Sequence, residues 1–357
     1  MSETIKLNGE IFNREKIADL KTSYESTVSW QSSIYEFLTN WFDDSDFIVS
    51  FTSGSTGTPK EIRLLKTSMR NSARMTNAFF GLDKTKTALL CLPASYIAGK
   101  MMLVRGIVGG FNLIIVEPKA NPFENLTLLI DFTAITPYQL YHSAETLKSG
   151  TIRNIIVGGG HINAKLEALA AEISASLYET YGMTETASHI ALRCLNGNRK
   201  SDYFTVLDGV SIRQDERNCL AISASHLAEK EFISNDIVEL KDSKSFRWLG
   251  RFDSVINSGG VKIHPEQLEK KLEEYIASNF FISSVPDELL GNKVVLVIES
   301  ETFNHEREEN LKAHFAKVLS KYEIPKQIFY LSAFIYSESN KFLRNETLAK
   351  VISPKIT

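Results

Sequence analysis

The sequence contains little cysteine. Only three of its 357 residues are cysteine, Cys91, Cys194 and Cys219, and they lie far apart. An odd number at such spacing fits neither a disulfide framework nor a zinc site, which indicates a reducing compartment. The N-terminus also lacks the basic start and apolar core of a signal peptide. We therefore expect a cytoplasmic protein.

Long apolar runs and an excess of one charge are also missing. Apolar stretches such as 113–116 and 294–298 are long enough for strands and too short to span a bilayer. A net charge of −3 gives no electrostatic reason to expect a nucleic acid or an anionic membrane as partner. The composition is that of a globular protein with room for two domains, and it leaves the oligomeric state open.

Strand and helix patterns alternate over residues 47–186, which predicts an α/β fold with a mostly parallel sheet covered by helices on both faces. Residues 1–46 read as mainly helical. Residues 200–250 show the short alternating runs of an antiparallel subdomain. We therefore predict a large N-terminal domain, residues 1–252, and a small mobile α+β C-terminal domain, residues 253–357.

A dense run of hydroxyl and glycine residues follows the apolar run 47–50, which predicts a buried strand. Glycines let backbone N–H groups converge on one point, and hydroxyls add donors that rotate to suit a ligand. Lys60, behind the run, adds a compact positive charge. The pattern predicts a polyphosphate loop, although it is not a P-loop, and a Ser/Thr/Gly-rich surface turn is the alternative. The residues expected to contact phosphate are Thr52, Ser53, Gly54, Ser55, Thr56 and Gly57.

A second glycine run, Gly158, Gly159 and Gly160, follows another predicted strand. Ligands bind at the carboxyl ends of strands in open α/β sheets, so this run is a candidate ligand loop; a plain strand-to-helix turn is the alternative. Further on, Asp236 stands just ahead of a predicted strand. A carboxylate there suits the two hydroxyls of a ribose, and a turn or cap residue is the other reading.

The string around Tyr181 and Gly182 combines three useful groups. Tyr181 offers a flat ring for stacking a base, and Thr184 offers a hydroxyl. Glu185 is a hard anionic ligand suited to Mg²⁺ beside a phosphate, although a lone glutamate after such a turn is often a solvated surface acid.

These strings, in this order, resemble the signatures of the adenylate-forming superfamily, which includes acyl-CoA synthetases, adenylation domains and luciferases. The matches are Thr-Ser-Gly-Ser-Thr-Gly-Thr-Pro-Lys at 52–60, Tyr-Gly-Met-Thr-Glu-Thr at 181–186 and Gly-Arg-Phe-Asp at 250–253. The resemblance implies that Tyr181 stacks on adenine, Thr184 meets a phosphate, Glu185 binds Mg²⁺ and Asp236 binds the ribose.

The same resemblance assigns roles near the predicted domain boundary. Arg251 would bond the ribose, and Asp253 would be the hinge; without the resemblance they read as a solvated pair beside a turn. Gly259 and Gly260 form a loop whose backbone can approach a ligand closely, and in acyl-CoA-forming members it lines the pantetheine tunnel. Lys341 would be the mobile catalytic lysine, although asparagine precedes it where the family has glycine, and a solvated lysine in the tail is the alternative.

A two-step reaction follows from the resemblance. A carboxylate would attack the α-phosphorus of ATP and release pyrophosphate, and CoA would then take the acyl group from the acyl-adenylate. Both first reactants are anions, so Lys60, Lys341 and Mg²⁺ at Glu185 would act by positioning and by neutralising charge. Rotation of the small domain about Asp253 would withdraw Lys341 from the reaction site and present the Gly259–Gly260 loop there.

The acid is expected to be compact, because the chain is short for the superfamily. The string 97–105 and this length resemble the o-succinylbenzoate-CoA ligases of menaquinone synthesis in the Bacteroidetes lineage, whose substrate is an aromatic dicarboxylate. Tyr96 occupies the family's aromatic or histidine position. Lys100 and Arg105 follow on a predicted helix, where at least one is expected to reach solvent; either would pair with a second substrate carboxylate if it faced the pocket.

Two other functions stay open. An adenylating enzyme could hand its acyl group to an amine or a carrier protein instead of CoA. A nucleotide-binding relative without catalysis is the second alternative, suggested by the altered sequence before Lys341.

Overall fold

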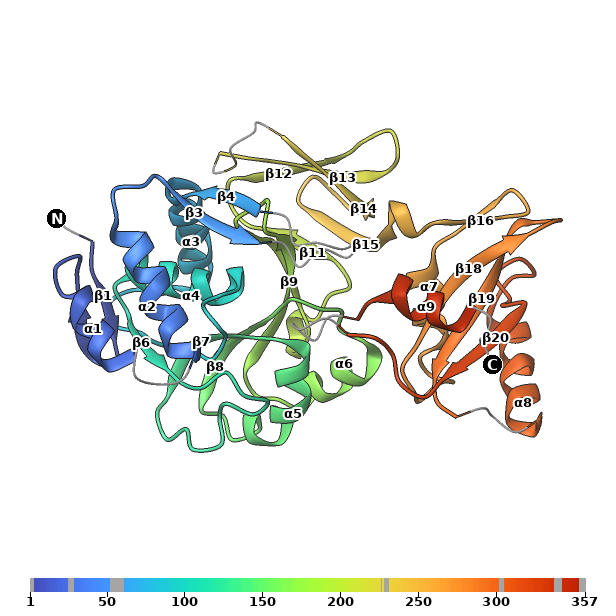
Figure 1. Ribbon diagram of the computed structural model, residues 1–357, viewed down its shortest axis with the longest axis horizontal. Helices are drawn as coiled ribbons and strands as arrows, with labels where there is room; N and C mark the ends of the chain where they lie inside the picture. The colour runs from blue at the N-terminus through green and yellow to red at the C-terminus, as the bar shows by residue number, and fades with distance from the viewer. Residues whose placement is uncertain are drawn as a thin grey trace.

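The computed structural model shows a large domain and a small domain joined by a short connection (Figure 1). The predicted phosphate loop, residues 52–60, and the Lys341 segment, residues 337–341, lie outside the described residues. The described residues are 3–24, 29–51, 61–225, 227, 231–301, 305–336 and 342–352.

One continuous sheet of 13 strands forms the centre of the large domain, and its first half is mainly parallel. The parallel strands follow the order β1-β6-β5-β7-β8-β9, and β2 (Glu10–Phe12) pairs antiparallel with β1 at the edge. This confirms the predicted α/β architecture. The six strands are β1 (Ile5–Leu7), β6 (Asn112–Ile115), β5 (Thr87–Leu90), β7 (Ile130–Ile135), β8 (Ile152–Val157) and β9 (Ser176–Met183).

The other half of the sheet is antiparallel and continues from β9. The antiparallel subdomain predicted for residues 200–250 is therefore an extension of the main sheet. Its strands, in spatial order, are β10 (Ser188–Cys194), β11 (Phe204–Val206), β15 (Ser245–Arg251), β14 (Phe232–Leu240), β13 (Cys219–Ala224) and β12 (Val210–Gln214). A short 3-10 helix, η1 (Gly197–Arg199), joins β10 to β11.

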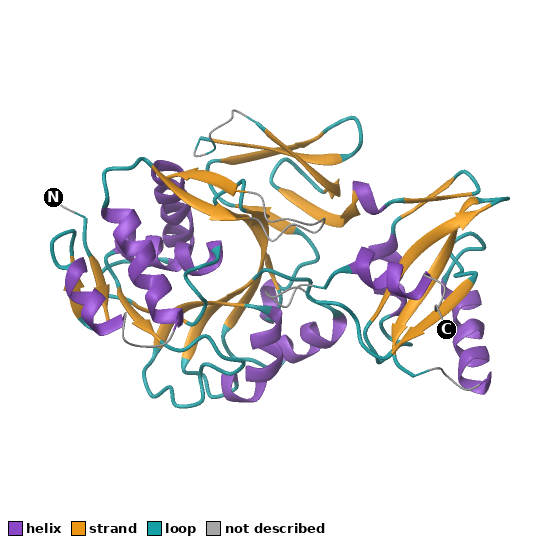
Figure 2. Ribbon diagram, in the orientation of Figure 1, coloured by secondary structure: helices purple, strands orange, loops and turns teal. Residues whose placement is uncertain are grey.

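Helices cover both faces of the parallel half (Figure 2). Successive residues of a strand point to opposite faces, so Ala88 and Leu90 of β5 join the core beneath α2, α3 and α4, whereas Leu89 and Cys91 join the core beneath α5 and α6. Strands buried on both faces explain the continuous apolar runs in the sequence. These helices, with α1 beside them, are α1 (Ile17–Tyr24), α2 (Ser29–Phe42), α3 (Lys66–Phe80), α4 (Ile97–Gly109), α5 (Pro137–Leu147) and α6 (Ala164–Ala171).

The small domain has its own five-stranded sheet, with β20 running parallel to β19. The connection contains η2 (Phe252–Ser254), so Asp253 lies between the two sheets. A separate core beneath α7 and α8 includes Leu268, Leu272 and Phe315. Its elements are β16 (Ile256–Ser258), β17 (Val261–Ile263), α7 (Pro265–Leu272), β18 (Phe280–Asp287), β19 (Gly291–Glu299), α8 (His305–Val318), β20 (Gln327–Leu331) and α9 (Arg344–Ile352).

The prediction that residues 1–46 are mainly helical is confirmed by α1 and α2, but two finer expectations for the N-terminal part are wrong. Residues 5–12 form β1 and β2 instead of helix, because Ile5 and Leu7 bury their side chains where β1 pairs with β6. The run 47–50 is also not a fully buried strand. It belongs to β3 (Phe47–Phe51), which forms only a two-stranded hairpin with β4 (Glu61–Leu65) and leaves Val49 exposed. Among the described residues, no helix is long and apolar enough to cross a membrane.

Candidate nucleotide and acyl site

The structure brings four of the predicted residues together. The Tyr181 hydroxyl, on β9, donates a hydrogen bond to Asp236 Oδ2 at 2.6 Å. Asp236 lies inside β14, not ahead of a strand as predicted, and pairs with Arg251 of β15. Arg251 in turn donates two hydrogen bonds to Asp253, at 2.8 and 2.7 Å. A carboxylate and a guanidinium group therefore lie beside a phenol, where they can bind polar groups of a ribose.

The ring of Tyr181 is held firmly by its neighbours. It is only 9% exposed, and it packs edge-on against Phe246 with ring centroids 4.9 Å apart. Burial and the Asp236 carboxylate raise the pKa of Tyr181, so the phenol stays neutral and acts as a donor. The predicted stacking of this ring on a base remains a prediction.

Thr184 and Glu185 lie in the tight turn between β9 and β10, and Glu185 is exposed. Two non-glycine residues just after it, Ala187 and Ser188, have φ angles of 56° and 144°. The Thr186 hydroxyl stabilises this turn, since it lies 2.6 Å from the Ser188 carbonyl and accepts a bond from the Met183 N–H. Unfavourable backbone geometry of this kind is concentrated at functional sites.

Glu185 is suited to Mg²⁺ as a single carboxylate. The described residues contain no group of three or more histidine, cysteine, aspartate or glutamate side chains that could hold a metal ion. Mg²⁺ is commonly bound by one or two carboxylates together with substrate phosphates and water. An exposed glutamate on a turn can supply one such carboxylate and leaves room for the phosphates and water.

The glycine run 158–160 connects β8 to α6 and packs against β9. A Cβ atom on Gly158 would lie 2.3 Å from the Thr180 hydroxyl oxygen, and Gly159 has a φ angle of 82°. A side chain at position 158 would therefore require Thr180 to move, and the left-handed backbone at position 159 favours glycine. The loop therefore lies close to β9 at Thr180, the residue directly before Tyr181.

The charged residues of α4 are buried, contrary to the expectation that at least one reaches solvent. Lys100 is 9% exposed and donates to the Val49 carbonyl at 3.0 Å, and burial lowers its pKa. Arg105 is 1% exposed, and burial lowers its pKa to about 9, so it is still charged at neutral pH. Tyr96, which precedes α4, is 46% exposed. The expectation that at least one of Lys100 and Arg105 reaches solvent is therefore wrong.

Arg105 has no carboxylate partner among the described residues. Its guanidinium group donates to the Ser188 hydroxyl oxygen at 3.0 Å and lies 3.4 Å from His189 Nδ1. Burial, with the Arg105 charge, lowers the pKa of His189 well below its usual range. Since Arg105 can only donate, Nδ1 accepts, and Nε2 carries the proton that faces the Thr76 hydroxyl at 3.2 Å. The contact of Arg105 with Ser188 and His189 was not predicted, although these two residues follow the 181–186 string after Ala187.

Gly259 and Gly260 form the turn between β16 and β17, with φ angles of 59° and 81°. The Gly259 N–H donates to the Leu290 carbonyl at 2.9 Å, which fixes the turn to the small domain. Figure 1 shows this hairpin directed away from the large domain. The structure therefore does not bring Gly259 and Gly260 near Tyr181 and Asp236.

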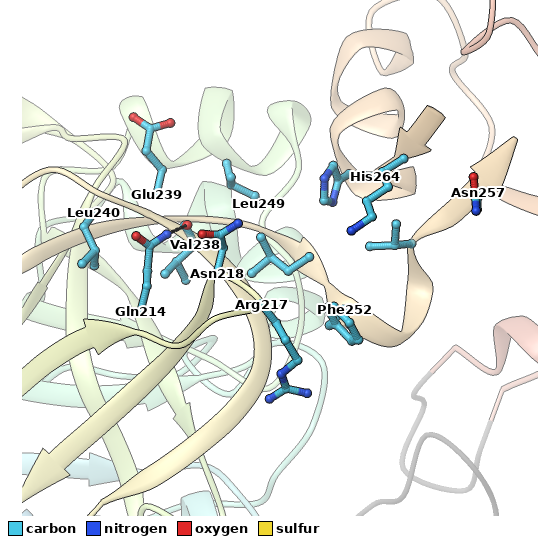
Figure 3. A pocket seen from close by; sticks show the side chains of 13 residues that line it. Gln214, Arg217, Asn218, Val238, Glu239, Leu240, Leu249, Phe252, Asn257 and His264 are labelled. Atoms are coloured by element: carbon cyan, nitrogen blue, oxygen red, sulfur yellow. Dashed lines mark hydrogen bonds between the residues drawn. The ribbon is translucent and has the colours of Figure 1, made fainter. Parts of the chain in front are cut away.

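A cavity of about 630 Å³ lies between the antiparallel half of the large sheet and the first hairpin of the small domain (Figure 3). Ile237 lines it, whereas the neighbouring Asp236 bonds Tyr181. Val238, Glu239 and Leu240 of β14 line it as well. Phe252 and His264 line its side toward the small domain.

Comparison with known proteins shows the family to which the chain belongs. The sequence pattern of the family described as AMP-binding enzyme matches residues 10–213. The chain belongs to this family. A structure of an acyl-CoA synthetase (AMP-forming)/AMP-acid ligase II-like protein from Dyadobacter fermentans is 35% identical to this AMP-binding enzyme. That match covers 92% of this chain and 98% of the other, with a TM-score of 0.58.

More distant relatives of this AMP-binding enzyme are named for the ligation of succinylbenzoate to CoA. The 2-succinylbenzoate–CoA ligase of Listeria monocytogenes is 25% identical over 351 residues, which are 91% of this chain and 74% of the relative. O-succinylbenzoate coenzyme A synthetase from Bacillus subtilis, in complex with ATP and magnesium ion, is 21% identical. That match covers 84% of this chain and 69% of the other, has a TM-score of 0.71 and supports the shared fold.

Proposed function

We propose that this AMP-binding enzyme is an acid–CoA ligase that converts o-succinylbenzoate to o-succinylbenzoyl-CoA through an acyl-adenylate, as a step of menaquinone synthesis. The observation that carries the choice of acid is the buried Arg105, which has no carboxylate partner among the described residues and bonds Ser188, just after the turn that bears Glu185. A charge without a partner in the interior is costly, and a second carboxylate on the substrate would supply the missing countercharge. The names of the distant relatives support the same acid.

The first step would occur between two anions. Asp236 and Arg251 would hold the ribose, and Thr184 would contact a phosphate. Mg²⁺ bound at Glu185 would neutralise charge on the phosphates. Lys60 and Lys341, which lie outside the described residues, are proposed to neutralise the leaving phosphates and the α-phosphate. No nucleophile from the protein is needed, since the substrate carboxylate itself attacks.

Arg105 would act on the acid through Ser188. The guanidinium group is buried, whereas Ser188 is only partly so. The Ser188 oxygen accepts from Arg105 and lies 3.5 Å from His189 Nδ1, so the Ser188 proton would turn from that nitrogen to be donated to a substrate carboxylate. Charge-assisted bonds are stronger than neutral ones, so the pair would favour a dicarboxylate over a monocarboxylate.

Incubation with ATP, Mg²⁺, CoA and o-succinylbenzoate tests the proposal, with pyrophosphate and acyl-CoA followed by mass spectrometry. We expect o-succinylbenzoyl-CoA, lost in Lys341→Ala and retained in the exposed control Lys321→Ala. Turnover of benzoate or a fatty acid, with none of o-succinylbenzoate, would overturn the choice of acid. Pyrophosphate without acyl-CoA would indicate a different acceptor, and no pyrophosphate with any acid would indicate a non-catalytic relative.

Variants of the Arg105 pair test specificity separately. Ser188→Ala should raise the KM for o-succinylbenzoate about tenfold, the effect of losing one charge-assisted hydrogen bond, and change the KM for ATP little. Arg105→Lys should have a similar effect, since an ammonium group cannot reproduce the planar donor geometry of a guanidinium. An equal loss of activity toward mono- and dicarboxylates would contradict a role in acid selection.

A further inference from the structure

One carboxylate of the small domain reaches the large domain at the end of the 158–160 loop. Glu273 directly follows α7, and its Oε2 accepts a hydrogen bond from the Ala164 N–H at 2.8 Å. Its Oε1 lies 3.8 Å from His161 Nε2. The Glu273 side chain is only 16% exposed, so it is largely covered by this contact.

The Ala164 N–H is a suitable partner for a carboxylate. Ala164 is the first residue of α6, where the N–H groups have no partner inside the helix and carry a partial positive charge. The Asn163 side chain already caps the helix by accepting from the Leu166 N–H at 3.0 Å. Glu273 therefore adds a second cap, supplied by another domain from 109 residues away.

The contact also reaches the candidate nucleotide loop. His161 directly follows Gly160, so Glu273 holds both the side chain next to the glycine run and the helix that ends the loop. His161 lies beside Trp248 of β15, with ring centroids 6.3 Å apart. The loop that leaves β8 is thus fixed at its far end by the small domain in the present orientation.

We propose that Glu273 is a positioning residue for the adenylation half-reaction. Its carboxylate holds the 158–164 segment in the form that binds ATP, and only while the small domain has its present orientation. The contact breaks when the small domain rotates for transfer to the thiol, which frees the loop and favours loss of AMP. This inference rests on the proposed two-step function.

A purely structural cap would affect both half-reactions equally, so they are measured separately. Adenylation is followed by exchange of labelled pyrophosphate into ATP. Thiol transfer is followed by acyl-CoA formation from supplied acyl-adenylate and CoA. Glu273→Ala should lower kcat/KM for ATP in the exchange about tenfold, the effect of one charge-assisted hydrogen bond, and leave thiol transfer within about twofold. Glu273→Gln, which keeps an acceptor without the charge, should fall between.

The neighbouring Glu274 provides the matched control, since it is exposed and its replacement by alanine should change neither half-reaction. Equal losses in both half-reactions of Glu273→Ala, or no loss in either, would overturn the proposal.

Hydrogen exchange supplies a readout that needs no substrate. Amides of the 158–166 segment should exchange faster in Glu273→Ala than in the unmodified protein, with no change in α5. Unchanged exchange would refute the contact in solution. Failure of the proposed function would instead appear as an unmodified protein that releases no pyrophosphate.

Discussion

The carboxylate of Glu266, on α7 of the small domain, fills the space that a side chain at position 250 would need. A Cβ atom on Gly250 would lie 2.5 Å from Glu266 Oε2. Gly250 also has a φ angle of 142°, which side chains rarely adopt. Because position 250 is glycine, β15 of the large domain and α7 of the small domain can pack closely against each other.

Gly250→Ala should separate the two domains and destabilise the protein by about 1–3 kcal/mol, because it combines strained backbone with a steric clash. The midpoint of urea unfolding measures the loss, and limited proteolysis at residues 252–256 measures the separation. Adding Glu266→Ala to this variant should restore the part of the lost stability that is due to the steric clash. Gly81→Ala, at a φ angle of 63° with no neighbour within 4 Å, is the control for strain alone.

Glu266 should make stability fall as pH rises. Burial raises its pKa, with Glu269 adding to the effect and Arg344 opposing it. The folded protein then holds the proton more tightly than the unfolded chain, in which a glutamate titrates near about 4.3. Stability is lost from that pH upward, through the raised folded-state pKa. Glu266→Gln should remove this slope in thermal unfolding measured upward from about pH 4, whereas the exposed Glu274→Gln should keep it.

Tyr181→Phe tests the hydrogen bond to Asp236 while keeping the ring in place. Loss of the phenol leaves the carboxylate without this donor, so Asp236 is held less precisely for a ribose. We expect the KM for ATP to rise about tenfold and kcat to change little, the pattern of lost binding common to ground and transition states. A large fall in kcat at unchanged KM would show that Tyr181 acts in the chemical step instead.

Arg193 is expected to be the most sensitive ion-pairing residue of the large domain. Its side chain is 8% exposed and pairs with Glu179 at 2.7 Å and Glu167 at 2.8 Å, which ties β10 to β9 and α6. Arg193→Met leaves Glu179 buried without this partner and should destabilise the protein by about 3–5 kcal/mol in urea unfolding.

Arg153→Met serves as the comparison, since that arginine is 57% exposed and lies 3.3 Å from Asp131. It should cost about 1 kcal/mol or less, because solvent screens exposed pairs. If Arg193→Met and Arg153→Met destabilised the protein equally, burial would not be what makes the Arg193 ion pairs important.

Local sequence patterns were enough to predict the α/β architecture and to point to most of the candidate nucleotide residues. Strand and helix periodicities are local, and the 181–186 and 250–253 strings carry their chemistry within a few residues. The residue type of Asp236 was enough to make it a candidate, but its position inside β14 was not predicted.

The environment of the charged residues depends instead on how distant elements pack together in the folded chain. The helix α4 is apolar almost all round, so its periodicity gives no sign of where Lys100 and Arg105 point. Their burial follows from packing against β3 and β10, where their partners lie 51 and 83 residues away in the chain. The Tyr181–Asp236 bond and the Glu273 contact likewise join residues 55 and 109 apart. Such pairs depend on strand order and domain orientation, which local sequence patterns do not specify.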